Sequence, residues 1–290
     1  MDITVLRNGI YPSQMSKWLT PLLVLLLTFN NLSHVTATTF PGTVEKVLVP
    51  SPEKDFPIRE VYVWTPPVQE GDATKLPVVY MLHGWPGSPS GLMSGTINSL
   101  ATAFENGASP FIAVFPDGNA KTHIDSEWAD SYDGKAMIET WLTKNVIQGV
   151  EGDNLRSRDN RAILGFSMGG YGAAIIGLHH PELYSKVVTL AGYFVIDDLT
   201  NAFGYPSSKN NKRTFQTPST HLKKSSQISW FLGESPQDLT LLIHGQADAW
   251  AKKLKTTNSK YVISKLPGGH SYTFVSNSME PVAKWLTWQV

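Results

Sequence analysis

No cysteine occurs among the 290 residues of this chain. The protein therefore contains no disulfide bond and carries no lipid on an N-terminal cysteine. An excess of charge of one sign is also missing, because 24 basic residues balance 24 acidic residues, and nothing in this balance indicates nucleic-acid binding. The sequence also lacks a Cys/His cluster, a His-Glu-x-x-His segment and a P-loop, so we expect no metal ion, nucleotide or other cofactor.

The sequence shows neither internal repeats nor a boundary to a second domain. Hydrophobic residues make up 41% of the chain and nine tryptophans are present, as in a globular protein. The length suits one large α/β domain. A core of about 250 residues is stable without disulfide bonds, since a domain of this size buries roughly 70–75% of its unfolded surface.

The N-terminal region has the pattern of a secretory signal. Lys17 precedes a short apolar core at residues 22–27, which is too short to span a bilayer because a spanning helix needs about 20 residues. Small residues then lead to Ala37, where we expect cleavage. We therefore expect residues 1–37 to be a signal peptide and residues 38–290 to be a secreted or periplasmic domain without an integral membrane segment. An uncleaved membrane anchor is the alternative.

Apolar runs that alternate with helical patterns predict a mostly parallel sheet covered by helices on both faces. Two Val-rich segments separated by prolines are expected to pair antiparallel at the start of the sheet. A helix is expected over residues 135–150, another from Tyr171 to about His180, and a last one over 281–290, beginning at Pro281. The expected strands are residues 44–49, 59–64, 77–82, 111–115, 162–164, 187–190, 239–243 and 261–264.

Residues 192–237 interrupt this alternation. They are rich in Ser, Asn, Lys, Pro and Thr, and they include seven aromatic residues. We interpret them as a cap-like insertion over the strand ends that carries substrate contacts. A disordered surface loop is the alternative, but the aromatic residues argue against it.

A segment with the pattern of a nucleophile elbow stands at residues 165–170, which read GFSMGG. An apolar strand, 162–164, precedes it, and the helical run 171–176 follows it. Strand, G-x-S-x-G and helix is the context in which a serine is placed on a strained turn above the sheet. The glycines two residues before and after Ser167 let the strand and helix approach closely. An ordinary glycine-rich turn is the alternative.

A serine hydroxyl needs a base to remove its proton, and in this architecture the base follows the serine and an acid along the chain. The first two histidines after Ser167 lie near the end of the helix that follows it, roughly 18 Å away. The third, His221, lies in the polar insertion, and the fourth, His244, precedes Asp248, the leading acid candidate. His270, in a glycine-rich loop after the last strand, is the predicted base. The five histidines after Ser167 are His179, His180, His221, His244 and His270.

The acid must orient the imidazole and stabilise its cation. Asp248 follows the expected strand 239–243, so we predict that it lies beside the His270 loop. A helix N-cap is the alternative role for this residue. Asp197 and Asp198, after the preceding strand, are the remaining candidates.

An oxyanion formed on attack needs two backbone N–H donors. Met168, the residue after the nucleophile, is one predicted donor. The other comes from the loop 83–87, which reads HGWPG. Because Pro86 has no N–H, Trp85 is the predicted second donor.

The polar loop that contains Trp128 and Asp130 supplies two candidate substrate contacts. Trp128 is a candidate floor for an acyl or aromatic pocket, and Asp130 is a candidate partner for a substrate hydroxyl. A solvated surface loop is the alternative.

These motifs together resemble the putative esterase family of α/β-hydrolases, which includes S-formylglutathione hydrolases, feruloyl and acetylxylan esterases and the mycolyltransferase antigens. The resemblance extends from about residue 45 to residue 287. Its strongest parts are Tyr80–Gly84, Gly165–Ala173 and Gly268–Ser271. It implies the α/β-hydrolase fold, a triad of Ser167, Asp248 and His270, and an oxyanion hole formed by Trp85 and Met168.

These features predict a secreted serine carboxylic-ester hydrolase that acts through an acyl-enzyme on Ser167. Its expected substrate is a small-molecule or polysaccharide-linked ester. An acyltransferase of the mycolyltransferase type, which passes the acyl group to a sugar or lipid hydroxyl, is the nearest competing hypothesis. A serine peptidase and a non-catalytic carbohydrate- or surface-binding protein on a hydrolase scaffold stay open as well.

Overall fold

The computed structural model describes residues 40–67 and 73–288. The predicted signal peptide, residues 1–37, lies outside the described residues. Among those that are described, no helix is long and apolar enough to cross a membrane.

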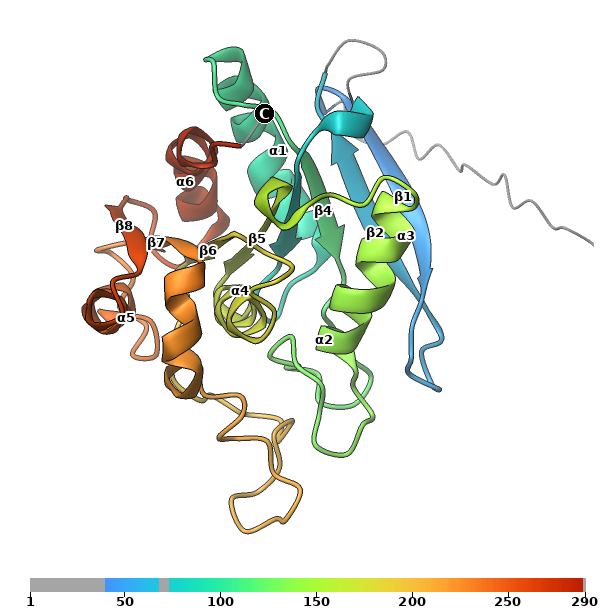
Figure 1. Cartoon of the computed structure of the whole chain (residues 1–290), viewed down its shortest axis with the longest axis vertical. Helices are drawn as coiled ribbons and strands as arrows, with labels where there is room; N and C mark the ends of the chain where they lie inside the picture. The colour runs from blue at the N-terminus through green and yellow to red at the C-terminus, as the bar shows by residue number, and fades with distance from the viewer. Residues whose placement is uncertain (1–39, 68–72, 289–290) are drawn as a thin grey trace, which may run out of the picture. The chain divides into compact units, whose positions relative to one another are not determined.

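An eight-stranded sheet carries the structure, with the strand order β1-β2-β4-β3-β5-β6-β7-β8 (Figure 1). The first two strands pair antiparallel, and β2 also runs antiparallel to β4. All the other neighbours are parallel. The prediction of a mostly parallel sheet with an antiparallel pair at its start is confirmed. The strands are β1 (Thr43–Pro50), β2 (Ile58–Thr65), β3 (Val78–Leu82), β4 (Ile112–Pro116), β5 (Arg161–Phe166), β6 (Lys186–Leu190), β7 (Ser229–Glu234) and β8 (Lys260–Lys265).

Helices cover both faces of this sheet (Figure 1). On one face α1 (Pro89–Glu105) packs against α6 (Tyr272–Trp285). The other face carries α4 (Met168–His179) and a continuous helical segment whose middle turn is π-helical. That segment consists of α2 (Ile138–Thr140), η2 (Trp141–Val146) and α3 (Ile147–Glu151). Helix α5 (Gln246–Thr256) packs on β7 and β8.

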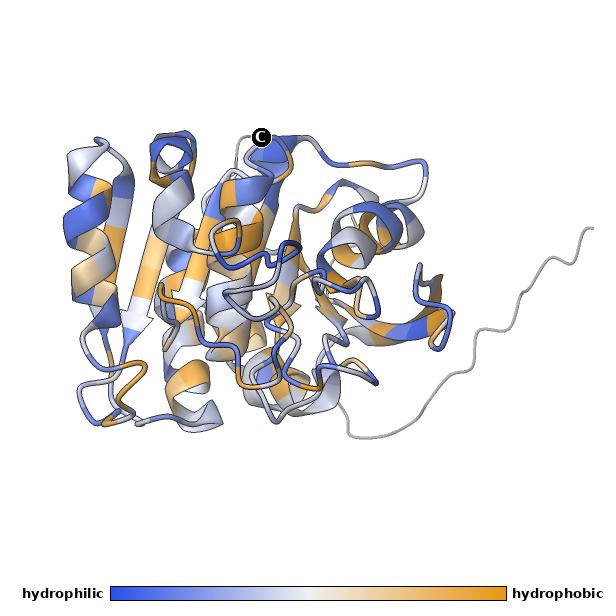
Figure 2. Ribbon diagram, turned by 90° about the horizontal axis from the view of Figure 1, so that it is seen from below, coloured by the Kyte–Doolittle hydropathy of each residue, from blue (hydrophilic) through white to orange (hydrophobic). Residues whose placement is uncertain are grey.

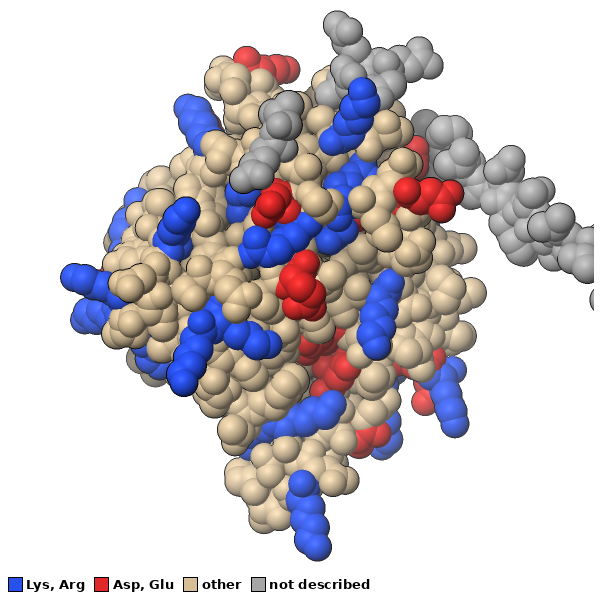
Figure 3. Space-filling model, viewed as in Figure 1, with Lys and Arg blue, Asp and Glu red and all other residues tan. Residues whose placement is uncertain are grey.

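The central strands have the burial expected of a parallel sheet between two helical layers. Every residue of β3 and of β5 is buried, whereas the edge strand β8 has no buried residue. Apolar colour is accordingly concentrated in the middle strands in Figure 2. On the face shown in Figure 3, basic and acidic side chains are interspersed, in keeping with the balanced charge of the chain.

The predicted strand at 239–243 is wrong. Residues 239–240 have no regular structure and 241–243 form a turn, and Leu239 and Leu241 are 78% and 98% exposed. The strand of this region is β7, ten residues earlier, which pairs with β6 on one side and β8 on the other. The segments 229–234 and 239–243 are both short and apolar, so their composition does not separate them.

The insertion therefore lies between β6 and β7, and its predicted end at 237 is too late. It ends with the 3₁₀ helix η4 (Pro218–Gln227), which packs against α4 and α5. Within it, Tyr193, Phe194 and Phe203 are buried in the core. Several of the aromatic residues that mark the insertion thus attach it to the domain.

Helix α6 begins at Tyr272, not at Pro281 as predicted. The hydroxyl of Ser271 caps it by accepting the N–H of Thr273 at 3.1 Å. Pro281 lies inside the helix. This start places His270 immediately before the cap, so the helix holds the end of the His270 loop in place.

A buried ion pair joins the end of α3 to the start of β5. Both carboxylate oxygens of Glu151 accept hydrogen bonds from the Arg161 guanidinium at 2.8 Å, and Tyr80 donates to Oε1 at 2.8 Å. The side chains of Glu151 and Arg161 are 0% and 4% exposed. Burial acts to raise the pKa of Glu151, but the hydrogen bonds from Arg161, Arg156 N–H and Tyr80, together with the charge of Arg161, outweigh it and hold the pKa below its ordinary value.

Replacing Glu151 by Gln is expected to lower the free energy of unfolding by about 3 kcal/mol, because it leaves the charge of Arg161 buried without its partner. Urea unfolding at pH 7 measures the change. Glu280→Gln is the matched control, since Glu280 pairs with Lys284 on the surface of α6. That control should cost less than about 0.5 kcal/mol. Equal losses in the two variants would contradict the assignment of Glu151 as a structural partner.

Candidate active site

Ser167 lies on a sharp turn between β5 and α4. Its backbone has φ 56° and ψ −120°, a conformation that non-glycine residues seldom adopt. The turn is possible because two glycines allow backbones to touch. A Cβ on Gly165 would lie 1.8 Å from the carbonyl oxygen of Gly169, and a Cβ on Gly169 would lie 2.1 Å from that of Leu82. The structure thus places Ser167 in the geometry of a nucleophile elbow.

A chain of two hydrogen bonds leads from Ser167 to a buried carboxylate. His270 Nε2 lies 2.9 Å from Ser167 Oγ, and His270 Nδ1 lies 2.7 Å from Asp238 Oδ2. The carboxylate of Asp238 is 0% exposed. Since an ionised carboxylate only accepts hydrogen bonds, Nδ1 carries the proton and Nε2 is free to accept the proton of the serine hydroxyl.

Asp248 does not occupy the position predicted for it. It lies in the first turn of α5, where its side chain is 54% exposed and pairs with Lys265 Nζ at 3.1 Å. The acid beside His270 is Asp238, which the sequence interpretation missed. The misplaced strand is the reason: Asp238 comes four residues after the true end of β7, inside the segment that was predicted to precede a strand.

Of the two remaining acid candidates, Asp197 and Asp198, neither is bonded to His270, and Asp198 is engaged elsewhere. Asp198 pairs with Arg213 inside the insertion, at 2.7 Å, and accepts the N–H of Phe203. The helix-capping role considered for Asp248 belongs to Glu234, whose carboxylate accepts the N–H groups of Gly245 and Ala247 at the start of α5.

The loops that carry the acid and the histidine are fastened to each other. Ser235 is fully buried, and its hydroxyl accepts the N–H of Gly269 at 2.9 Å. The imidazole of His244 also lies 3.1 Å from the carbonyl oxygen of Asp238. These contacts fix Asp238 relative to His270 at the end of two adjacent strands.

The segments that carry the two predicted oxyanion donors lie next to Ser167. Met168 is the first residue of α4, and the first N–H groups of a helix have no partner within it. Gly84 lies so close to Ser167 that a Cβ on Gly84 would come within 3.0 Å of Ser167 Cβ. The loop 83–85 therefore lies against Ser167, with Trp85 38% exposed at its end.

The two candidate substrate contacts are not placed at this site. Trp128 is 0% exposed, so in this structure it offers no surface to a substrate. Both carboxylate oxygens of Asp130 are bonded to Thr140, one to its N–H and one to its hydroxyl. Asp130 borders a cavity of about 280 Å³ shared with His179 and His180, at the opposite end of α4 from Ser167.

Buried acids gather beside the site, between the loop after β4 and the beginning of the insertion. Glu127 is 0% exposed, and its Oε2 accepts the hydroxyl of Tyr193 at 2.5 Å. Burial raises the pKa of Glu127 well above its ordinary range. Burial, and then the charges of Asp197 and Asp198, raise the pKa of Asp125 to about 6.

Comparison with known proteins gives a consistent result. A family model described as "Putative esterase" matches residues 58–283. The chain is 29% identical over 167 residues to the diacylglycerol acyltransferase/mycolyltransferase Ag85A of Mycobacterium leprae, a match that covers 56% of this chain and 46% of that protein. It is 23% identical over 241 residues to an acetyl esterase of Caldicellulosiruptor saccharolyticus, covering 74% of this chain and 85% of the esterase.

Among solved structures, a ferulic acid esterase is similar, with a TM-score of 0.70 and 19% identity, covering 86% of this chain and 98% of that chain. This likeness shows the α/β-hydrolase fold, as expected. It concerns the arrangement of the sheet and helices and not the choice of substrate.

Asp125 is expected to make stability depend on pH. An unfolded Asp titrates near pH 3.9, so between about pH 4 and pH 6 the folded state keeps a proton that the unfolded state has lost. The contribution of this residue to stability therefore falls as the pH rises through that window and stays constant above it. The variant Asp125→Asn cannot ionise.

The stability of Asp125→Asn relative to wild type should therefore increase from pH 4 to pH 7 by about 2–3 kcal/mol. Urea unfolding at the two pH values measures it. The exposed Asp153 provides the control, since Asp153→Asn should show no such increase. A constant difference between Asp125→Asn and wild type at both pH values would disprove the assignment.

Proposed function

This chain belongs to the putative esterase family of α/β-hydrolases and is a serine esterase, and on that premise we propose that it hydrolyses carboxylic esters through an acyl-enzyme on Ser167. The hydrogen-bonded chain Asp238–His270–Ser167, at a strained elbow between β5 and α4, is the observation that carries the proposal. An intact chain of this kind argues against a non-catalytic binding protein on the same scaffold.

In the acylation step, His270 Nε2 removes the proton of Ser167 as Oγ attacks the ester carbonyl carbon. The negative charge that develops on the carbonyl oxygen is stabilised by the N–H groups of Met168 and Trp85. The ester C–O bond then breaks, His270 gives its proton to the departing alcohol, and the acyl group stays on Ser167.

In the deacylation step, water attacks the acyl-enzyme and loses its proton to His270 Nε2. The tetrahedral intermediate collapses, the carboxylic acid leaves, and the proton returns to Ser167 Oγ. Asp238 stabilises the imidazolium that forms in both steps and keeps the proton of neutral His270 on Nδ1. The side chain of His270 is 31% exposed, so water can reach it.

The substrate that we propose is a small-molecule or polysaccharide-linked ester. The insertion begins directly after β6, beside the serine, because the N–H of Ser167 donates to the carbonyl of Leu190. Val195 and Leu199 are 43% and 69% exposed there, and they provide apolar surface for the acyl or alcohol part of the substrate.

We propose in addition that the enzyme is exported to the periplasm or the medium, on the basis of the pattern at residues 1–37.

An acyltransferase is the second candidate function, favoured by the similarity to the mycolyltransferase of Mycobacterium leprae. Both reactions form the same acyl-enzyme, and they differ in whether water or a sugar or lipid hydroxyl receives the acyl group. Product analysis with and without an added alcohol such as trehalose separates them.

Replacing Ser167 by Ala is expected to lower kcat for p-nitrophenyl acetate by at least about 10⁴-fold, since the nucleophile is lost. The variant should fold normally and should not react with a fluorophosphonate probe. Ser276→Ala is the matched control, because it removes a hydroxyl that bonds Ser99 Oγ between α1 and α6. Hydrolysis by Ser167→Ala at the wild-type rate would refute the proposed mechanism.

Two aspartates test the acid assignment. Asp238→Asn is expected to lower kcat by roughly 10³–10⁴-fold, because an amide beside Nδ1 favours the wrong tautomer and does not stabilise the imidazolium. Asp248→Asn removes an exposed partner of Lys265 and should change kcat by less than about twofold. Steady-state kinetics of the two variants decide, and the opposite ranking would restore Asp248 as the acid.

A further inference from the structure

The proposed reaction needs the N–H of Trp85 to point at the oxyanion, and the structure shows what holds it there. The peptide that carries this N–H also contains the carbonyl of Gly84. Because a peptide group is planar and trans, its C=O and N–H point in opposite directions. Whatever fixes the Gly84 oxygen therefore fixes the direction of the Trp85 N–H.

The side chain of His83 fixes that oxygen. His83 is fully buried, its Nδ1 lies 2.8 Å from the Gly84 oxygen, and its Nε2 lies 3.0 Å from the backbone nitrogen of Gly118. A carbonyl oxygen can only accept a hydrogen bond, so Nδ1 of His83 carries a proton. The imidazole of His83 thus donates to the peptide that presents the oxyanion donor.

Trp128 fixes the preceding peptide in the same way. Its indole N–H donates to the carbonyl oxygen of His83 at 3.0 Å. Its ring also packs edge-on against the His83 imidazole, with centroids 5.1 Å apart. The two successive peptides of the loop 83–85 are therefore both anchored by ring N–H donors; Trp128 provides one of these donors and packs against the other, the His83 imidazole.

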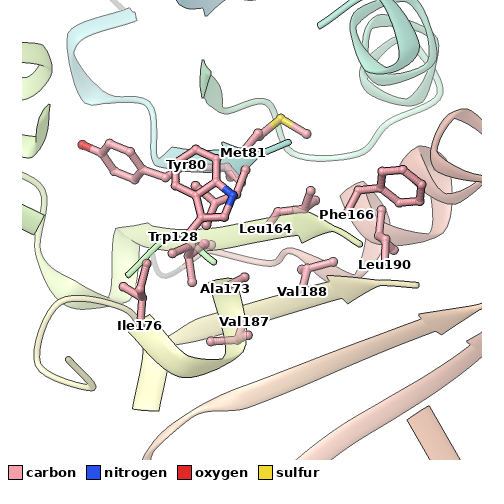
Figure 4. Close-up of a cluster of buried hydrophobic side chains, with 14 of the residues drawn as sticks. Tyr80, Met81, Trp128, Leu164, Phe166, Ala173, Ile176, Val187, Val188 and Leu190 are labelled. Carbon is pink, nitrogen blue, oxygen red and sulfur yellow. The ribbon is translucent and has the colours of Figure 1, made fainter. Parts of the chain in front are cut away.

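Trp128 is packed tightly between α4 and the loop after β4. A Cβ on Gly172 would lie 2.6 Å from Trp128 Cβ, and a Cβ on Gly118 would lie 2.6 Å from the indole Cε2. Gly172 belongs to α4, the helix that begins with the other oxyanion donor, Met168. In Figure 4 the indole lies between strand residues such as Tyr80 and Met81 and the α4 residues Ala173 and Ile176. Trp128 thus links the two halves of the oxyanion hole.

The backbone at this position is strained. Glu127 and Trp128 have φ values of 52° and 56°, a region that is energetically unfavourable for a non-glycine residue. Side-chain contacts hold the strained pair: Tyr193 binds the Glu127 carboxyl, and Ser126 Oγ accepts the Trp128 N–H and donates to the Gly118 carbonyl. Strain that is held by its surroundings in this way is typical of functional sites.

We propose that Trp128 is a positioning residue that holds the loop 83–85 so that the Trp85 N–H meets the oxyanion. The proposal rests on the proposed esterase function. Trp128 touches no substrate and acts through His83 and the backbone of the loop.

The test replaces Trp128 by Phe, which keeps an aromatic ring and removes the N–H. We expect kcat for p-nitrophenyl acetate to fall 10- to 100-fold with KM within threefold, since complete loss of an oxyanion donor costs about 10²–10³ in kcat. The matched control is Trp64→Phe, because Trp64 is also fully buried and donates its indole N–H to a backbone carbonyl, that of Pro41 at 2.7 Å. We expect the control to lose stability and keep its kcat.

A second readout separates positioning from a general structural effect. A trifluoromethyl ketone forms a tetrahedral, anionic adduct with the serine and so reports on the oxyanion hole. Its affinity for Trp128→Phe should fall in parallel with kcat, whereas affinity for the product alcohol should not change. If Trp128→Phe does not fold, Ser126→Ala, which loosens the Trp128 backbone, should still lower kcat by 3- to 10-fold.

The outcomes are distinguishable. Unchanged kcat and unchanged ketone affinity in Trp128→Phe, with an active wild type, would overturn the positioning role alone. So would a drop in kcat equal to that of Trp64→Phe. A wild type that neither hydrolyses esters nor reacts with a fluorophosphonate would overturn the proposed function and this inference with it.

Discussion

The site depends on one close contact between backbone segments. With Cβ atoms at Gly165 and Gly169, the end of β5, the start of α4 and the end of β3 would overlap. Without them, these segments come into direct contact, and Ser167 is forced into its positive φ at the end of the central strand. The same contact brings the loop after β3 against the serine. Ser167 and the loop 83–85 are therefore positioned by a single steric constraint.

The rest of the site follows from the parallel sheet. In a parallel sheet, the loops after neighbouring strands emerge at the same edge, so residues far apart in sequence meet there. Ser167 follows β5, Asp238 follows β7 and His270 follows β8. Ser167 and His270 are 103 positions apart and share a hydrogen bond. Buried Ser235 then joins the last two loops, which fixes the position of Asp238 relative to His270.

The buried acids of the domain fall into two groups, which differ in whether a cationic or histidine side chain is bonded to the carboxylate. Glu151 and Glu139 have cationic or histidine partners. Burial acts to raise the pKa of Glu139, but hydrogen bonds from His179 and His180 outweigh it and lower the pKa to about 2. Asp125 and Glu127 have no such partner among the described residues, and burial raises both of their pKa values. Asp125 and Glu127, the two acids without such a partner, lie next to the strained Trp128. Destabilising features of this kind are expected at functional sites.

The local motifs of the sequence led directly to much of this arrangement. The elbow at 165–170 needs only its own glycines and the strand and helix that flank it, so the pattern of adjacent residues is sufficient. The parallel strands could be predicted because full burial requires continuous apolar runs, as in β3 and β5. His270 could be singled out because the order of serine, acid and histidine along the chain leaves few candidates.

The identity of the acid was decided by tertiary structure. Residues 229–234 and 239–243 have similar composition, and only pairing with β6 and β8 makes the first a strand. That choice shifts the end of the strand and brings Asp238 to His270 in place of Asp248. The burial of Trp128 could not be predicted from local sequence either. Its sequence neighbours suggest an exposed loop, but contacts with Gly118, Gly172 and His83 bury it. The sequence by itself led to Ser167, because adjacent residues form its elbow, to His270, because of its order along the chain, and to most strands of the sheet, because full burial requires apolar runs. The acid and the support of the oxyanion loop were left to the packing of distant segments, which no local pattern encodes.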